Sequence, residues 1–399
     1  MDSIEFSRNV LFVRRNYLLD RITAELRVSK VVALLGPRQS GKTTLAREFC
    51  QGAKIAFDSD LNYFDLEDPA HLERLTNPKL ALEPLRGLVV IDEVQLRPDL
   101  FPVLRVLADR EGSDARFLIL GSASRDLIRQ GSETLAGRIG FVEVTPFGLR
   151  ETSETEHLWL RGGFPVSVLA ETEPDSWRWR ANYIRTFLER DIPALGLQIP
   201  AATLRRFWTM LAHYHGQTFN ASEIGKNLGV ADHTAKRYLD LLTGTFMVRS
   251  LTPWFENLGK RQIKTPKIYF RDSGILHQLL GISNLAALVV HSKLGASWEG
   301  FALEQVIRLS GASEEEVYFW GVHNQGELDL LLMRDGRRRG FEVKYTDTPR
   351  VTTSQKLAIE CLGLDRLDII CPGDAKYPLT DRIHVTGLDR VRDLFADGR

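Results

Sequence analysis

The sequence has little cysteine, no excess charge of either sign and no apolar run of membrane-spanning length. Its 399 residues include three cysteines, Cys50, Cys361 and Cys371, which do not have metal-ligand spacing and which we expect to be reduced thiols in a cytoplasmic protein. The 52 Lys and Arg residues balance 52 Asp and Glu residues, so any nucleic-acid-binding surface must be a local patch. Without a long apolar segment, we expect neither export nor membrane insertion.

A glycine-rich motif, GPRQSGKTT, follows the apolar run at residues 31–35 and precedes a helical pattern at 45–49. Strand, glycine loop and helix in this order form the context in which G-x-x-x-x-G-K-[ST] binds phosphate, and chance alone would produce the match roughly once in 70 chains of this length. Lys42 would reach the β- and γ-phosphates, and the Thr43 hydroxyl would hold Mg²⁺. The sequence therefore predicts that ATP and Mg²⁺ bind at Gly36, Pro37, Arg38, Gln39, Ser40, Gly41, Lys42, Thr43 and Thr44.

Two acids end a later apolar run, Leu88 to Ile91, which is typical of a parallel strand buried on both faces. Alone, Asp92 and Glu93 could be a solvated pair, but about fifty residues after a P-loop they have separate expected roles. Asp92 would hold the Mg²⁺ shell, and Glu93 would polarise the attacking water. Ser122 follows another apolar strand, where its hydroxyl could contact the γ-phosphate or hold the water. Alternating strands and helices predict a parallel sheet with helices on both faces.

Five segments occur in a fixed order: GPRQSGKTTLAREF, LVVIDEVQ, LILGSAS, LAGRI and TPFGLRE. In these the chain resembles the prokaryotic AAA+-type ATPases whose C-terminal half has been classed as a domain of unknown function, and the resemblance covers nearly the whole chain. In such ATPases an arginine after the sensor strand reaches the nucleotide of a neighbouring subunit, and Arg138 matches that position. The resemblance therefore implies a homo-oligomer, with a hexameric ring as one form. A surface or sheet-end arginine is the alternative.

A helix-turn-helix pattern lies in the middle of the chain. Residues 221–230 predict a short helix that ends at Gly229, and residues 233–242 predict a second helix after a three-residue turn. A strand-like run at 246–251 and a basic run at 260–264 would form the wing of a winged helix.

The same region carries a local charge excess, because residues 203–270 contain ten Lys and Arg against four Asp and Glu, a net charge of +6. This excess favours salt-sensitive contacts with DNA phosphates and little sequence selectivity. A packing module is the alternative. The expected DNA-binding residues are Lys236, Arg237, Lys260, Arg261 and Lys264.

Charged residues surround a predicted hairpin near the C-terminus, with its turn at Asp335-Gly336. The strand period puts Glu342 and Lys344 on one face, and the hairpin can bring Asp329 beside them. This arrangement resembles the PD-(D/E)xK restriction-endonuclease-like nucleases, although the segment before Asp329 lacks the proline of that motif. The alternatives are a solvated hairpin, or a fold kept to grip DNA without cutting it. The resemblance implies a Mg²⁺ site formed by Asp329, Glu342 and Glu299, with Lys344 assisting the water.

These patterns predict an α/β chain with an AAA+-like P-loop NTPase sheet, a helical linker, a winged helix and a restriction-endonuclease-like domain. The first functional hypothesis is an oligomeric, ATP-dependent motor that translocates on, unwinds or branch-migrates branched, duplex or single-stranded DNA. The others are an ATP-gated nuclease and a nucleotide-dependent regulatory switch. The expected domains are residues 1–151 (ATPase), 152–202 (lid or linker), 203–282 (winged helix) and 283–399 (nuclease-like).

Overall fold

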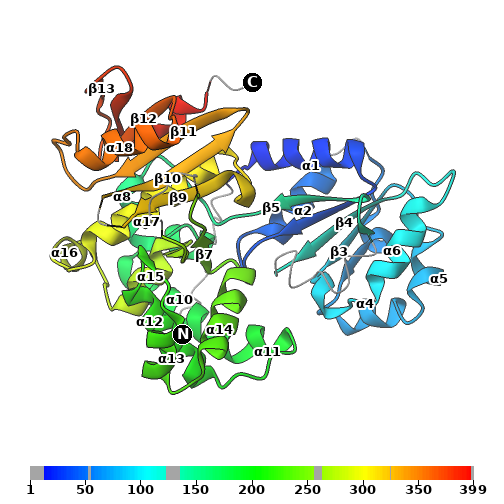
Figure 1. Ribbon diagram of the computed structural model, residues 1–399. Helices are drawn as coiled ribbons and strands as arrows, with labels where there is room; N and C mark the ends of the chain where they lie inside the picture. Colours follow the sequence, from blue (N-terminus) through cyan, green and yellow to red (C-terminus); the bar gives the residue numbers. More distant parts are fainter. Residues whose placement is uncertain (1–12, 53–54, 123–134, 256–262, 324, 397–399) are drawn as a thin grey trace, which may run out of the picture.

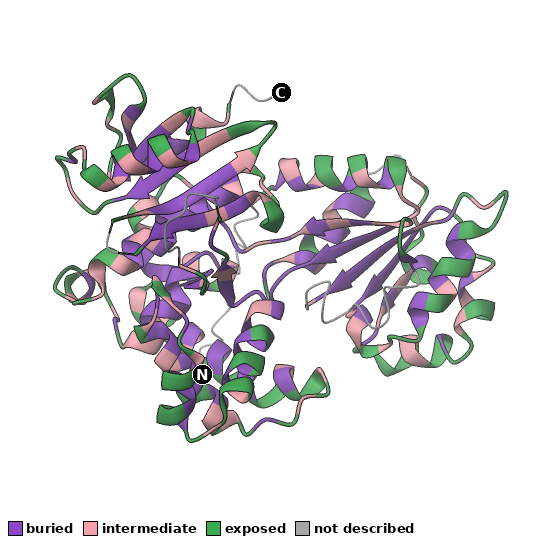
Figure 2. Ribbon diagram, in the orientation of Figure 1, coloured by how far each residue is buried: buried purple, intermediate pink, exposed green. Residues whose placement is uncertain are grey.

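Two large β-sheets, one near each end of the chain, are joined by a mainly helical region (Figure 1). The computed structural model describes residues 13–52, 55–122, 135–255, 263–323 and 325–396. Most strand residues of both large sheets are buried, whereas exposed residues lie mainly on the outer faces of the helices (Figure 2). Among the described residues, no helix is long and apolar enough to cross a membrane.

The N-terminal sheet is parallel, as the apolar runs predict. Along β1, Val32 and Leu34 pack against α1 and α2, whereas Val31 and Ala33 face the helices on the other side. The sheet order is β2 (Tyr63–Asp65), β3 (Leu88–Asp92), β4 (Arg116–Gly121), β1 (Val31–Leu35) and β5 (Ile139–Glu143). The helices are α1 (Asn16–Val28) and α2 (Lys42–Gly52) on one face, and α4 (Pro69–Arg74), α5 (Pro78–Leu82) and α6 (Leu100–Asp109) on the other, with short α3 (Ser59–Asn62) and η1 (Val94–Leu96).

A series of helices follows the first sheet. Arg180 is fully buried among them, and its guanidinium donates to the carbonyl oxygens of Ser176, Leu160 and Gly274. Three helices are thereby joined by one cation. The linking helices are α8 (Thr155–Arg161), α9 (Pro165–Val168), α10 (Glu173–Thr186), η3 (Phe187–Asp191) and α11 (Ile192–Ala194).

The next part, here called the middle unit, contains the predicted pair of helices. Helix α13 ends at Gly229, whose φ of +77° suits glycine, and α14 begins at Asp232. A three-stranded antiparallel sheet in the order β6-β8-β7 packs beside them. The elements of the middle unit are α12 (Ala201–His213), β6 (Gln217–Thr218), α13 (Ala221–Leu228), α14 (Asp232–Gly244), β7 (Val248–Leu251), β8 (Lys267–Phe270) and α15 (Ser273–Leu280).

The C-terminal unit is a mixed six-stranded sheet between α17 and α18. Its β10–β11 hairpin turns at Asp335-Gly336, both with positive φ, as an Asp-Gly turn favours. In sheet order the strands are β13 (Lys376–Pro378), β14 (Ile383–Gly387), β12 (Arg366–Cys371), β11 (Arg337–Val343), β10 (Gly326–Arg334) and β9 (Val317–Val322). The helices are α16 (Leu285–Val289), α17 (Leu294–Ser310), η4 (Glu314–Glu316), α18 (Thr353–Leu362) and η5 (Leu388–Leu394).

The segment after β7 pairs with β9, the edge strand of the C-terminal sheet. The amide of Trp254 donates to the carbonyl oxygen of Phe319 at 2.7 Å. The amide of Phe319 donates to the carbonyl oxygen of Thr252 at 3.1 Å. Farther on, the amide of Ile263 donates to the carbonyl oxygen of Gly321 at 3.1 Å. Both ends of the predicted wing are therefore attached to the C-terminal unit.

Candidate active site

The phosphate-binding loop lies between β1 and α2, at the carboxyl edge of the first sheet. Its glycines let it curl tightly, because a Cβ at Gly36 would lie 2.2 Å from the carbonyl oxygen of Val144, and Gly41 has a φ of +92°. The buried ammonium of Lys42 donates to the carbonyl oxygens of Gly36 at 3.0 Å and Pro37 at 2.9 Å. A curled loop, an ammonium and the N-terminus of α2 fit a nucleotide's phosphates.

Oxygen atoms suited to Mg²⁺ lie beside this loop. The Thr43 hydroxyl donates to Asp92 Oδ2 at 2.7 Å, and the Tyr63 hydroxyl donates to the same oxygen at 3.2 Å. Asp92 ends β3 and is 3% exposed. A threonine hydroxyl and a strand-end carboxylate are the protein ligands that P-loop NTPases supply to Mg²⁺, so Thr43 and Asp92 fit the ion.

Glu93 follows directly after β3 in a left-handed conformation, with φ of +57°. A non-glycine residue held there costs on the order of 1–2 kcal/mol, which the surrounding structure must offset. The Gln95 side chain contacts both predicted catalytic groups: its amide donates to the Glu93 carboxylate and, at 3.0 Å, to Ser122 Oγ. Gln95 is the last residue of the segment LVVIDEVQ, but no role was predicted for it. Its sequence signals are its place in that segment and its position two residues after the predicted base.

Burial sets the charge states at this site. It raises the pKa of the Glu93 carboxyl, although the nearby Lys42 ammonium opposes that shift. Burial also lowers the pKa of Lys42 to about 8, against the attraction of Glu93 and Asp92. A carboxylate whose pKa is raised accepts a proton more readily, which suits the role predicted for Glu93.

The phosphate-binding loop also contacts the linking helices. Arg38 forms ion pairs with Asp191 of η3 at 3.1 Å and with Glu67 at 2.8 Å. The Tyr183 hydroxyl donates to the carbonyl oxygen of Arg38 at 3.3 Å. A movement of this loop would therefore change its contacts with α10 and η3.

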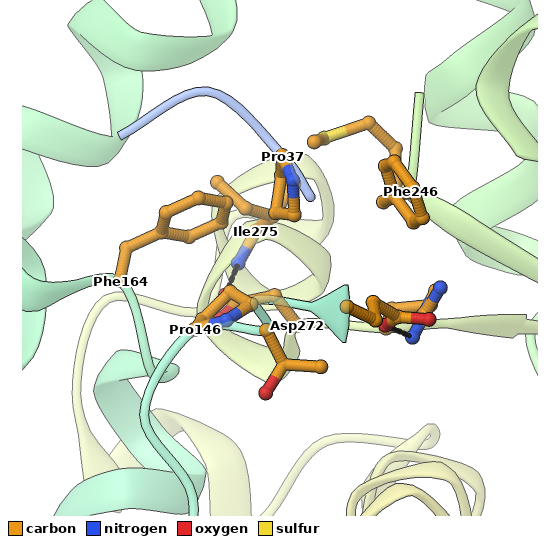
Figure 3. Close-up of a pocket in the computed structure, with 10 residues that line it drawn as sticks. Pro37, Pro146, Phe164, Phe246, Asp272 and Ile275 are labelled. Carbon is orange, nitrogen blue, oxygen red and sulfur yellow. Dashed lines mark hydrogen bonds and ion pairs between the residues drawn. The ribbon is translucent and has the colours of Figure 1, made fainter. Parts of the chain in front are cut away.

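A small pocket joins the loop to the middle unit. Figure 3 shows Pro37 above Ile275, with Phe164 and Phe246 on either side. Phe246, which lies between α14 and β7, has a φ of +62°. The loop therefore shares a pocket with the residue that links the second helix of the pair to the small sheet.

A buried charge network joins all three parts of the chain. Arg271, next to β8, pairs with Glu143 at the end of β5 and lies 3.8 Å from Glu304 of α17. Arg249 of β7 donates to Glu304 at 2.5 Å. Although burial alone would raise it, these cations bring the pKa of Glu304 down to about 2.

Arg138 lies far from the phosphate-binding loop of its own chain. It directly precedes β5, whose first residue pairs with Val31 at the start of β1, whereas the loop follows the end of β1. Its side chain is 41% exposed and forms an ion pair with Asp109 at 2.5 Å. The position does not suit action on its own nucleotide and leaves a role in a neighbouring subunit as a prediction.

Three of the predicted DNA-binding residues lie on exposed surface: Lys236 and Arg237 on α14, and Lys264 before β8. Lys260 and Arg261 lie outside the described residues. Two other cations of the basic segment are internal, because Arg249 pairs with Glu304 and Lys267 lies among carboxylates of the C-terminal unit. The exposed charge is therefore smaller than the sequence count suggests.

The predicted nuclease residues are near one another, as the hairpin implies. Asp329 and Glu342 lie on neighbouring strands, the Val343 amide donates to Asp329 Oδ2 at 2.8 Å, and Lys344 pairs with Glu342 at 2.8 Å. The metal site expected at Asp329, Glu342 and Glu299 is nevertheless not formed. The described residues contain no group of three or more Asp, Glu, His or Cys that could hold a metal ion. The ammonium of Lys267 lies beside these carboxylates, 3.9 Å from Asp329 and 3.8 Å from Glu299.

Solved structures resemble the chain distantly. The Walker-type ATPase PABY2304 of Pyrococcus abyssi has a TM-score of 0.46 at 16% identity, over 67% of this chain and 96% of that one. A RuvB P216G mutant of Thermotoga maritima has a TM-score of 0.27 at 16% identity, over 60% and 91% of the two chains.

Sequence relatives are much closer. The AAA domain family matches residues 28–153, and two domains of unknown function, DUF8612 and DUF4143, match residues 152–286 and 294–391. The uncharacterized protein Rv2008c of Mycobacterium tuberculosis is 49% identical over 383 residues, which are 96% of this chain and 85% of that protein. The uncharacterized protein Mb2031c of Mycobacterium bovis matches to the same extent. The chain therefore belongs to the family of AAA-type P-loop ATPases that carry a C-terminal DUF4143 domain and include these mycobacterial proteins.

Proposed function

We propose that this protein hydrolyses ATP with Mg²⁺ and couples the reaction to DNA as an oligomeric motor. The observation that carries the ATPase part is the contact of Thr43 with Asp92, with Lys42 and Glu93 beside it. These residues supply an oxygen pair for a cation, an ammonium for the phosphates and a carboxylate base.

Each of these side chains has its own task. Bound Mg²⁺ supplies neutralisation of charge on the phosphate oxygens. Lys42 offsets further phosphate charge, Glu93 takes the proton of the attacking water, and Gln95 orients the Glu93 carboxylate. Ser122 accepts a hydrogen bond from the Gln95 amide, so a movement of Gln95 would also move the Ser122 hydroxyl.

The DNA part rests on the middle unit. Its two helices and small sheet follow the order of a winged helix, and α14 exposes Lys236 and Arg237. In such folds the second helix of the pair enters or follows a groove, and lysine and arginine contacts to phosphate give salt-sensitive binding. Because both ends of the wing are attached to β9, α14 would provide most of the contact.

The route of coupling would run through the phosphate-binding loop. Arg38 contacts η3, and Pro37 lines the same pocket as Phe246, the residue between α14 and β7. A change in the loop on binding or losing a γ-phosphate would therefore reach the proposed DNA-binding helix within the same chain. These contacts also favour a second candidate, a switch in which bound nucleotide changes DNA affinity with little turnover. A nuclease is not proposed, because the described residues contain no group of acids that could hold its metal.

The test measures ATP turnover with no DNA and with single-stranded, duplex and branched DNA. A motor should show DNA-stimulated turnover that disappears in Lys42→Ala, whereas a switch should show slow turnover that DNA leaves unchanged. Replacing Lys236, Arg237 and Lys264 with alanine should weaken binding to unrelated sequences alike. It should also flatten the dependence of log affinity on log salt by about 0.9 per lost phosphate contact.

The matched control replaces Arg27 and Arg105, exposed cations of the ATPase region. DNA affinity should stay unchanged in that variant. If both variants weakened DNA binding equally, the binding would not depend on α14 in particular. If the variant at Lys236, Arg237 and Lys264 bound DNA as tightly as the wild type, the middle unit would serve only in packing.

A further inference from the structure

The side chain of Lys267 projects from β8 of the middle unit into the carboxylate cluster of the C-terminal unit, here defined as Glu299, Glu327, Asp329 and Glu342. Its ammonium forms an ion pair with Glu327 and lies 3.8 Å from Glu299 and 3.9 Å from Asp329. Lys267 is 4% exposed. Three carboxylates around one ammonium favour its charged form.

The position of Lys267 is fixed by its backbone. Strand β8 is the central strand of the three-stranded sheet, where Lys267 pairs with Thr218 of β6 and Leu251 of β7. The strand period puts Tyr269 on the same face, and its hydroxyl donates to Glu299 at 2.6 Å. A lysine on a flexible surface segment could move away from a metal ion. Lys267 cannot move in this way, because its backbone belongs to a strand that is hydrogen-bonded on both sides.

The carboxylates are mostly engaged by groups of the chain itself. Asp329 Oδ2 accepts from the Val343 amide, Glu342 Oε1 pairs with Lys344, and Glu299 accepts from Tyr269. The buried Glu342 Oε2 has no hydrogen-bond partner among the described residues. Glu342 Oε2 therefore remains available to a cation, whereas the Lys267 ammonium already lies beside Glu299 and Asp329.

We propose that Lys267 is the resident cation of this cluster, that it excludes divalent metal ions, and that the cluster is an ionic lock between the middle and C-terminal units. A divalent ion at Asp329 and Glu299 would lie close to an ammonium that a central strand prevents from leaving, and like charges at such distances repel strongly when buried. The lock does not depend on the ATPase or DNA-binding proposals.

The test measures Mn²⁺ binding in an Asp92→Asn background, so that the nucleotide site does not contribute. The Asp92→Asn protein should bind no Mn²⁺ through Asp329. Lys267→Met in the same background keeps the length of the stem and removes the charge. It should gain on the order of one bound Mn²⁺ per chain, and its melting temperature should rise by about 3 °C when Mn²⁺ reaches ~100 times the dissociation constant.

Two controls make the result specific. Lys267→Arg keeps a cation and should bind no Mn²⁺, and adding Asp329→Asn to Lys267→Met should abolish the gain. A Lys267→Met protein that folds but gains no Mn²⁺ site would overturn the proposal.

A second measurement needs no change at Lys267. If electron paramagnetic resonance detects Mn²⁺ bound to the Asp92→Asn protein, and Asp329→Asn removes that signal, then Lys267 does not exclude the metal. That outcome would overturn the proposal even if Lys267→Met failed to fold, and its absence would support it.

Discussion

At the scale of single residues, the Glu93–Gln95 pair separates two contributions to catalysis. Glu93→Gln should bind ATP normally but hydrolyse it at least about 10²-fold more slowly, because it removes the proton acceptor and leaves the phosphate-binding loop intact. Gln95→Ala should slow hydrolysis less, because it removes only the group that orients the acceptor. Steady-state turnover and nucleotide binding, measured on the same preparations, check both expectations.

The pH profile distinguishes orientation from simple structural damage. The Gln95 hydrogen bond lowers the pKa of Glu93, so removing it should raise that pKa. The acidic limb of the rate profile should therefore move to higher pH in Gln95→Ala. An unchanged profile, or wild-type turnover by Glu93→Gln, would contradict these roles.

Motif residues could be assigned from the sequence because their local context defines their chemistry. Lys42, Thr43 and Asp92 lie next to one another because a loop and a strand end meet at one edge of a parallel sheet. Lys267 could not be assigned in this way. In the sequence it belongs to a basic segment, and only tertiary packing places it beside Glu327 and Asp329 of β10, about sixty residues later.

At the scale of elements, a buried chain of hydrogen bonds connects α8, α15 and α17. The Trp159 indole donates to Ser297 Oγ at 3.0 Å, and Ser297 lies 2.7 Å from His277 Nε2. His277 Nδ1 lies 3.0 Å from the carbonyl oxygen of Leu160, to which it must donate. The Ser297 hydroxyl then donates to Nε2, so every group is satisfied by a neutral imidazole.

This chain makes stability depend on pH. Burial lowers the pKa of His277 to about 4, whereas in the unfolded chain it is near 6.5. Between these values the unfolded state binds more protons, so stability falls as the pH falls, by up to about 1.4 kcal/mol per pH unit for this histidine. Denaturant unfolding of the wild type and His277→Gln between pH 7.5 and 5 checks this.

The quantity to compare is the difference between the two proteins in how the free energy of unfolding changes with pH, because other buried titratable groups contribute equally to both. The wild type should lose stability more steeply than His277→Gln below pH 6.5. Parallel curves would mean that His277 is protonated in the folded protein.

Apolar periodicity located most elements but not the contacts between units. The runs at β1, β3 and β4 were recognisable because strands buried on both faces are continuously apolar. The pairing of Trp254 with Phe319 was not recognisable, because it joins separate units and depends on backbone groups rather than side-chain pattern.

At the scale of the whole molecule, the position of Arg138 bears on assembly. It lies at the amino edge of the first sheet, opposite the phosphate-binding loop, so it could reach only another subunit's nucleotide. Arg138→Ala should bind ATP normally and hydrolyse it poorly. Mixed with Lys42→Ala it should regain activity, because some interfaces then pair an intact loop with an intact arginine.

Turnover of the mixture, compared with the mean of the two separate variants, is the measurement. Subunit exchange is verified with two affinity tags. Exchange without recovery would argue for a structural role of Arg138, through its pair with Asp109.

The pairing of the segment after β7 with β9 has a consequence for biosynthesis. An uncovered edge strand exposes backbone donors and acceptors that other chains can join. Residues 252–254 leave the ribosome before β9 does, so a partner for this edge already exists when the strand emerges. The C-terminal sheet can therefore form against a segment that is already attached to a folded neighbour. A fragment that begins after residue 263 would contain the same six strands but would leave the β9 edge open to aggregation.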